Sequence, residues 1–112
     1  MTPAHVTLGV SDLDASARFY GEALGLDVRR SETGLRITFG DFALLLEEAR
    51  PAERAKLQIG FLVPSAALLG AIAERARKSG GQVLAGPADR DGGGQVLLLM
   101  DPDQYQLEII AP

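Results

Sequence analysis

The chain has 112 residues, a length typical of one domain and sufficient to bury about two thirds of the unfolded surface. Apolar residues make up 46% and charged residues 23%, which excludes a disordered chain. The net charge is −4 and no basic run exceeds two residues, which argues against binding to nucleic acid or to an anionic membrane surface. The absence of cysteine excludes disulfides, a thiolate nucleophile and zinc–thiolate sites.

The N-terminal sequence MTPAHVTL lacks a basic segment followed by an apolar one, so it does not resemble a secretion signal. The longest apolar runs, 42–46 and 96–100, are too short to span a bilayer. We therefore expect one domain over residues 1–112, located in the cytoplasm and without a membrane partner.

The first half of the chain predicts a strand, a helix and three further strands. Residues 4–10 alternate between apolar and polar side chains, as a half-buried strand does. Ser11 or Asp12 can cap a helix that ends at Gly25. Three more strands are predicted, over 26–30, 35–39 and 42–46.

The second half predicts the same order after a polar connector over 49–56. A strand over 57–63 is followed by a helix that starts after Pro64-Ser65 and runs to Ser79. A short strand over 82–84 comes next, and the glycines at 92–94 lie in a turn. The last two strands are predicted over 96–100 and 105–110.

The two halves, 1–50 and 56–112, are therefore repeats of one unit, in which His5 aligns with Gln58. One half alone buries too little surface, so the halves pack against each other or against a second chain. The strands over 42–46 and 96–100 are apolar on both faces. We expect their second face to be covered by a second subunit, by more core or by a partly closed cavity.

Three polar residues lie on the faces opposite the main apolar sets of their strands: His5, Gln58 and Glu108. An imidazole, an amide oxygen and a carboxylate can together bind a divalent ion such as Mn, Fe, Co, Ni or Zn if the sheet curls and brings them together. The alternative is that they are ordinary exposed polar side chains, which is the commoner case for such a scattered set. No serine lies in a G-x-S-x-G motif, so a Ser-His-Asp triad is not indicated.

Three motifs resemble the vicinal oxygen chelate superfamily, which includes glyoxalase I, extradiol dioxygenases and the fosfomycin and bleomycin resistance proteins. They are HVTLGVSDLDASARFYGEALGLDV at 5–28, GDFALLLEE at 40–48 and DPDQYQLEII at 101–110. The resemblance implies an α+β fold in which two βαβββ modules form a cup-shaped mixed sheet. It also implies a homodimer, with a small molecule bound inside the cup.

The resemblance further implies metal ligands at His5 and Glu108, with Gln58 standing where many metal-dependent members have histidine. Leu45 stands where the family has a glutamate on the fourth strand, and Glu47 replaces it only if the strand register shifts. On this interpretation the protein is a metal-dependent lyase, isomerase or dioxygenase. Glu108 would also act as a base when displaced from the metal.

The competing interpretation is a metal-free binding protein. The segments FYGEALGLDV and DPDQYQLEI also resemble bleomycin resistance proteins, which sequester a cationic drug between subunits. The acidic balance suits such a ligand, whereas four Phe, two Tyr and no Trp leave few rings for stacking. A small structural or regulatory module with a vestigial cup is the third alternative.

Overall fold

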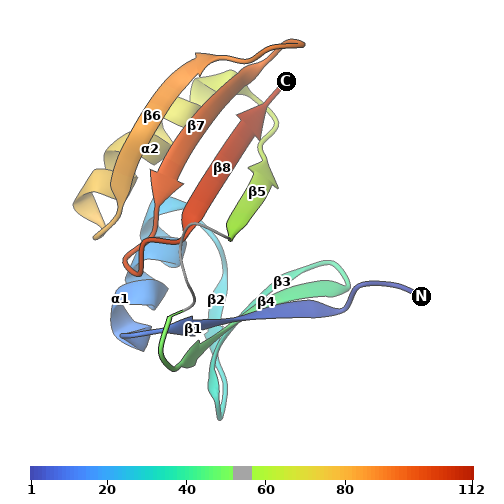
Figure 1. Cartoon of the computed structure of the whole chain (residues 1–112), viewed down its shortest axis with the longest axis vertical. Coiled ribbons are helices and arrows are strands. Elements are labelled where there is room, and N and C mark those ends of the chain that lie inside the picture. Colours follow the sequence, from blue (N-terminus) through green and yellow to red (C-terminus); the bar gives the residue numbers. More distant parts are fainter. Residues whose placement is uncertain (52–56) are drawn as a thin grey trace.

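The computed structural model describes residues 1–51 and 57–112, which form the two expected βαβββ modules (Figure 1). Module one contains β1 (His5–Val10), α1 (Leu13–Arg18), the π-helical turn η1 (Phe19–Ala23), β2 (Val28–Arg30), β3 (Gly34–Phe39) and β4 (Phe42–Glu48). Module two contains β5 (Gln58–Leu62), the 3-10 turn η3 (Ala66–Leu68), α2 (Leu69–Lys78), β6 (Gln82–Asp89), β7 (Gln95–Met100) and β8 (Gln106–Ala111).

Each module builds its own four-stranded mixed sheet, in the orders β1-β4-β3-β2 and β5-β8-β7-β6. β1 runs parallel to β4 and β5 runs parallel to β8, while the other pairs are antiparallel. The α+β fold of two repeated modules is therefore confirmed. Within the described residues no strand pairing joins the two sheets, so β1 and β5 each remain at an open edge.

The helix boundaries follow the predicted capping residues. The Asp12 carboxylate accepts a hydrogen bond from the Ala15 N–H at the start of α1, and Ser65 caps η3 in the same way through the Ala67 N–H. Gly25 ends the first helical segment with a φ of +68°, a conformation that glycine adopts at little cost.

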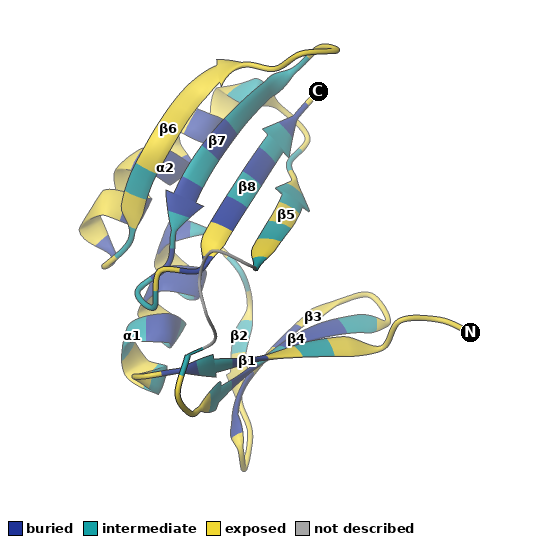
Figure 2. Cartoon of the chain, in the orientation of Figure 1, coloured by how far each residue is buried: buried dark blue, intermediate teal, exposed yellow. Residues whose placement is uncertain are grey.

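Strand alternation gives each sheet one face that is covered by its own helix, and we call the opposite side the helix-free face. The covered face of module one lies against α1, and the covered face of module two lies against α2 (Figure 2). The covered faces and their helices form a single buried cluster. The largest fully buried side chains include Phe19, Tyr20, Leu46, Leu99 and Leu107.

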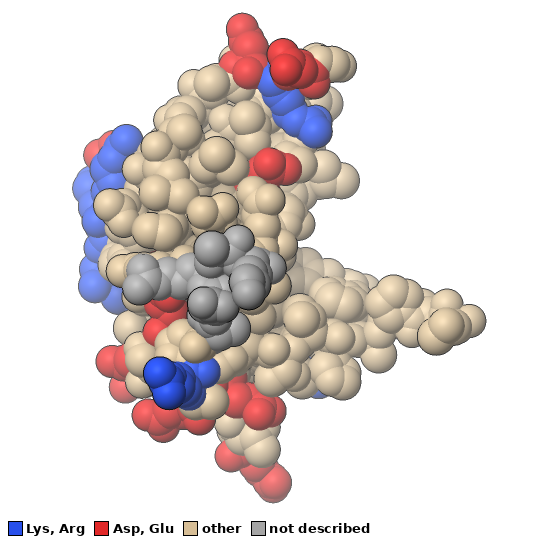
Figure 3. All heavy atoms as spheres, viewed as in Figure 1, with Lys and Arg blue, Asp and Glu red and all other residues tan. Residues whose placement is uncertain are grey.

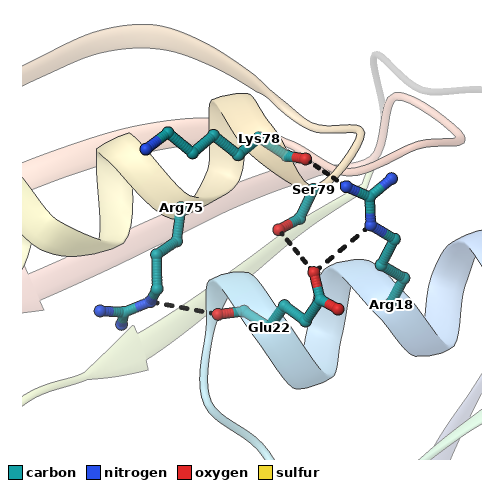
Figure 4. A network of polar contacts seen from close by, with 5 residues as sticks. All are labelled: Arg18, Glu22, Arg75, Lys78 and Ser79. Atoms are coloured by element: carbon teal, nitrogen blue, oxygen red, sulfur yellow. Dashed lines mark hydrogen bonds and ion pairs between the residues drawn. The ribbon is translucent and has the colours of Figure 1, made fainter.

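The two modules are held together where their helices meet (Figure 4). The Arg18 guanidinium donates to the carbonyl oxygen of Lys78, at the end of α2, over 2.5 Å. In the opposite direction, Arg75 Nε donates to the carbonyl oxygens of Glu22 and Ala23, at the end of η1, over 3.1 and 3.3 Å. Each helix therefore supplies an arginine to the free carbonyls at the other's C-terminus.

A buried polar contact crosses the same boundary at the turn before β8. The Tyr20 hydroxyl donates to Asp101 Oδ2 over 2.6 Å, and Asp101 Oδ1 accepts from the N–H groups of Asp103 and Tyr105. The Tyr105 hydroxyl in turn donates to the carbonyl oxygen of Gly9 over 2.7 Å. The Asp-Pro-Asp turn therefore fixes both the start of β8 and the position of module one against module two.

One element is longer than predicted. β6 was expected over 82–84 but extends over Gln82–Asp89. Its pairing with β7 shifts register twice, so its side chains do not keep the alternation by which a strand is recognised. Of the predicted connector over 49–56, residues 52–56 lie outside the described part of the chain. No helix in the described residues is long and apolar enough to cross a membrane.

Candidate functional site

Gln58 and Glu108 lie together on the helix-free face of module two. The register places Gln58 beside Gln106 and Gly60 beside Glu108 on the neighbouring strands β5 and β8. Gln58 and Glu108 are thus diagonal neighbours whose side chains project from the same face.

Glu108 sits at the centre of a face that is otherwise mostly apolar. Its two strand neighbours are Gly60 on β5 and Leu98 on β7. Val96 and Ile110 share this face and, like Leu98, are only half-buried. Glu108 is a half-buried residue, and its carboxylate has no hydrogen bond or ion pair within the described residues. It is therefore available to bind a cation or to accept a hydrogen bond from a ligand.

His5 lies on the helix-free face of module one, where it is exposed and paired with Ala43. On the same face Leu45 is paired with Thr7, and Glu47 is paired with Gly9. Glu47 is therefore about 13 Å along the strand direction from the level of His5, at about 3.3 Å per residue. The register shift that would bring Glu47 to the position of Leu45 does not occur, and Leu45 is the closer side chain to His5.

The structure thus brings Gln58 and Glu108 together and leaves His5 on the other sheet. In the described ranges no three His, Cys, Asp or Glu side chains gather where they could hold a metal ion. The predicted set contains the amide of Gln58 and is not such a group, and its member His5 lies on a different sheet from the other two. Metal binding by His5, Gln58 and Glu108 stays a prediction.

The repeat shows what module one carries in place of Glu108. Thr7 and Gly60 occupy equivalent positions on β1 and β5, and their partners are Leu45 and Glu108 respectively. One strand further on, Leu45 pairs with Arg36 of β3, whereas Glu108 pairs with Leu98. Module two therefore presents a carboxylate beside a leucine, and module one presents a leucine beside a guanidinium.

The sequence patterns did not identify Arg36 as a site residue. It is exposed and is directly opposite Arg29, whose guanidinium is held by Asp27. Among the arginines of the described helices and strands, only Arg36 has neither an ion pair nor a side-chain hydrogen bond. The alternation over 35–39 places Arg36 on the polar face of its strand, but only the strand pairing relates its position to that of Leu98.

An apolar cavity of about 530 Å³ lies between the two modules. Every residue that lines it is apolar or glycine, and its walls come from the helix-covered side of both sheets, for example Val6 and Leu44 opposite Ile59 and Ile109. Uncharged residues surround the notch between the modules in Figure 3. The two helix-free faces are therefore turned away from this inner space and from each other.

The rim of this cavity is incompletely covered. Phe39 and Phe61, one from each module, are in ring contact at 5.8 Å. Leu62 on the open edge of β5 is 84% exposed, and Phe39 is 37% exposed. No polar side chain of the described residues lines the cavity, and Leu62 on the open edge of β5 forms part of its rim.

The chain matches a family model described as the Glyoxalase/Bleomycin resistance protein/Dioxygenase superfamily over residues 2–109. A glyoxalase-related enzyme from Fulvimarina pelagi has a similar structure, with a TM-score of 0.88 and 27% identity over 100% of this chain and 88% of that one. A glyoxalase/bleomycin resistance protein from Albidiferax ferrireducens gives a TM-score of 0.84 at 23% identity, covering 97% of each chain. No curated protein sequence matches the chain.

Proposed function

Because the chain belongs to the Glyoxalase/Bleomycin resistance protein/Dioxygenase superfamily, we propose that it binds a small molecule in a cup shared by two copies of the chain. The orientation of the two helix-free faces supports the involvement of a second copy of the chain. Within one chain they are turned away from each other, so His5 and Glu108 can border one site only if the facing module comes from a partner.

The open strand edges support the way in which the two copies would pair. β2 has three residues, two of them arginines, and β6 has two register shifts, so both of these edges resist further pairing. β1 and β5 are regular strands, each with one unpaired edge, and residues of both strands line the apolar cavity. Pairing β1 of one copy with β5 of the other would cover Leu62 and the cavity rim together.

This pairing would also create a continuous binding face. The helix-free side of module one from one copy would continue into the helix-free side of module two from the other. His5 and Gln58 would lie on the two strands at the junction, and Leu45 and Glu108 one strand further out on either side. A homodimer would contain two such cups.

The function that this geometry supports best is metal-independent binding of a small molecule, and the observation that carries it is the pair Leu45–Arg36. The position equivalent to Glu108 cannot coordinate a metal, and the neighbouring guanidinium adds a positive charge that disfavours a divalent cation. The half-buried apolar residues around Glu108 supply the contact area for an apolar ligand.

A metal-dependent enzyme is the second candidate, and the unpartnered Glu108 beside Gln58 favours it. His5 from the partner copy would complete a donor set of imidazole, amide and carboxylate. Such an ion would act as a Lewis acid toward a bound oxygen. Gln58 is a neutral and weaker ligand than histidine, so this donor set fits a metal only in part. For both candidate functions we propose that the protein is located in the cytoplasm.

The first experiment separates the two candidates. The metal-stripped protein is titrated with Mn, Fe, Co, Ni and Zn while its melting temperature is recorded, because an ion that binds only the folded state raises that temperature. If binding is metal-independent, no added metal should raise the melting temperature in a way that depends on His5 or Glu108. An increase that disappears in both His5→Ala and Glu108→Gln contradicts it and establishes the metal site.

The second experiment tests the binding face with the neutral fluorescent probe N-phenyl-1-naphthylamine. We expect Leu98→Gln to weaken its binding, because Leu98 lies beside Glu108 on the helix-free face. Leu68→Gln is the matched control, since Leu68 is an exposed leucine in η3. Equal binding by the wild type and the Leu98 variant would contradict the proposed position of the site.

A further inference from the structure

We propose that the ligand carries an anionic group and that Arg36 binds this group. The inference rests on the proposed function, because it assigns a ligand class to the same cup. Its basis is the unpaired guanidinium at the position where the other module has Leu98.

No neighbouring side chain in the described part of the chain forms an interaction with the Arg36 guanidinium that would stabilise the fold. It is directly opposite Arg29 on β2, and like charges in this arrangement are destabilising. Asp27 is already engaged by Arg29 through both of its carboxylate oxygens. The carboxylate of Glu47 is a diagonal neighbour on the same face, yet it forms no ion pair with Arg36. Arg36 therefore retains its capacity to bind an anion from solution.

The neighbouring side chains suit an oxyanion. Thr38 follows Arg36 on the same face of β3, and Thr7 lies two strands away in the same row. Both threonines are exposed and carry hydroxyl donors. A guanidinium presents a planar fork of N–H groups that matches a carboxylate, phosphate or sulfonate with two parallel hydrogen bonds.

The two walls of the cup then orient the ligand. Its anionic end lies against module one at Arg36, and its apolar body lies against Leu98 and Ile110 of module two. Glu108 lies on the module-two wall between Leu98 and Ile110, so the anionic group of the ligand is expected at Arg36 and away from Glu108. The charge nearest each end of the ligand, rather than the net charge of −4 of the whole chain, sets this orientation.

The test compares two probes that share one ring system. 8-Anilinonaphthalene-1-sulfonate carries an anionic sulfonate, and N-phenyl-1-naphthylamine lacks it. Fluorescence titration of the dimeric protein gives a Kd for each probe. We expect Arg36→Gln to weaken binding of the sulfonate probe about tenfold and to leave the neutral probe unchanged. Arg36→Lys, which retains the charge without the fork, should give an intermediate value.

Arg90→Gln is the matched control, because Arg90 is an exposed arginine in the β6–β7 turn without a side-chain partner in the described residues. Equal affinity of the wild type and Arg36→Gln for the sulfonate probe overturns the assignment of Arg36. If Leu98→Gln still weakens binding of the neutral probe in that case, the proposed binding site is retained and only the proposed preference for an anionic ligand is wrong. If Leu98→Gln changes neither probe, the proposed function falls together with this inference.

Discussion

Asp101 is the residue on which the buried contact between the modules depends. Its carboxylate accepts three hydrogen bonds, from the Tyr20 hydroxyl and from two backbone N–H groups of its own turn. Burial raises the pKa of this carboxyl, and the three hydrogen bonds, which favour the charged form, offset only part of that effect. The side chain thus combines a structural role with a sensitivity to pH.

The raised pKa fixes the sign of a pH effect on stability. The folded protein holds the Asp101 proton more tightly than the unfolded chain, so protonation stabilises the fold. This contribution is complete below the ordinary aspartate pKa of about 4 and is lost as the pH rises through the folded-state value. We expect the free energy of unfolding of the wild type, relative to Asp101→Asn, to decrease as the pH rises from about 4. Urea unfolding across this range measures it, and a difference that increases with pH would show that the pKa is lowered.

At the level of elements, the reciprocal contacts between α1–η1 and α2 hold the modules at a fixed angle (Figure 4). A cation at a helix C-terminus interacts favourably with the helix dipole, and here each cation is supplied by the opposite module. Glu22 strengthens the junction, because its carboxylate accepts hydrogen bonds from Arg18 and from the Ser79 hydroxyl. The junction thus links residues that are more than fifty positions apart.

Two arginines of α2 allow this contact to be tested against a matched control. Arg75→Ala removes donors to two carbonyl groups of the other module, and we expect a loss of about 1–2 kcal/mol in the free energy of unfolding. Arg77→Ala removes only an exposed ion pair with Glu74 on the same helix, so its loss should be below about 1 kcal/mol. Chemical unfolding of both variants measures the difference. Equal losses would show that the arginine at position 75 is a surface residue only.

The sequence predicted the helices and strands well where capping residues, glycines and strand alternation determine them locally. The Asp12 cap, the glycine end at Gly25 and the strand alternation depend on near neighbours in the chain. The last part of β6 was missed, since its two register shifts are set by the pairing with β7. The repeat could be recognised from strand phase, which also allowed His5 and Gln58 to be aligned correctly on equivalent strands.

The whole molecule has open edges that a second copy would cover, and β5 offers a direct test. Leu62→Lys places a charge at a residue that is 84% exposed, so it should leave the fold of one chain intact and prevent edge pairing. We expect the wild type to sediment as a dimer and this variant as a monomer. Leu68→Lys, at another exposed leucine, should remain dimeric. A monomeric wild type would contradict the shared cup.

The sequence did not predict how the two modules are arranged relative to each other. Alternation correctly placed His5, Gln58 and Glu108 on helix-free faces, yet it contains no information on whether those faces meet within one chain. That depends on the helix contacts through Arg18 and Arg75, which no periodic pattern encodes. The equivalence of the positions of Arg36 and Leu98 likewise emerged only from the strand pairing.

The outward orientation of the helix-free faces has a genetic consequence. If each cup combines module one of one chain with module two of the other, a chain carrying Arg36→Gln and a chain carrying Leu98→Gln are each defective in both cups of their own homodimer. In a mixed dimer both lesions fall into one cup, and the other cup is wild type throughout. Two alleles that each bind the anionic ligand weakly should therefore complement each other in the same cell, restoring at most one full-affinity binding site per mixed dimer.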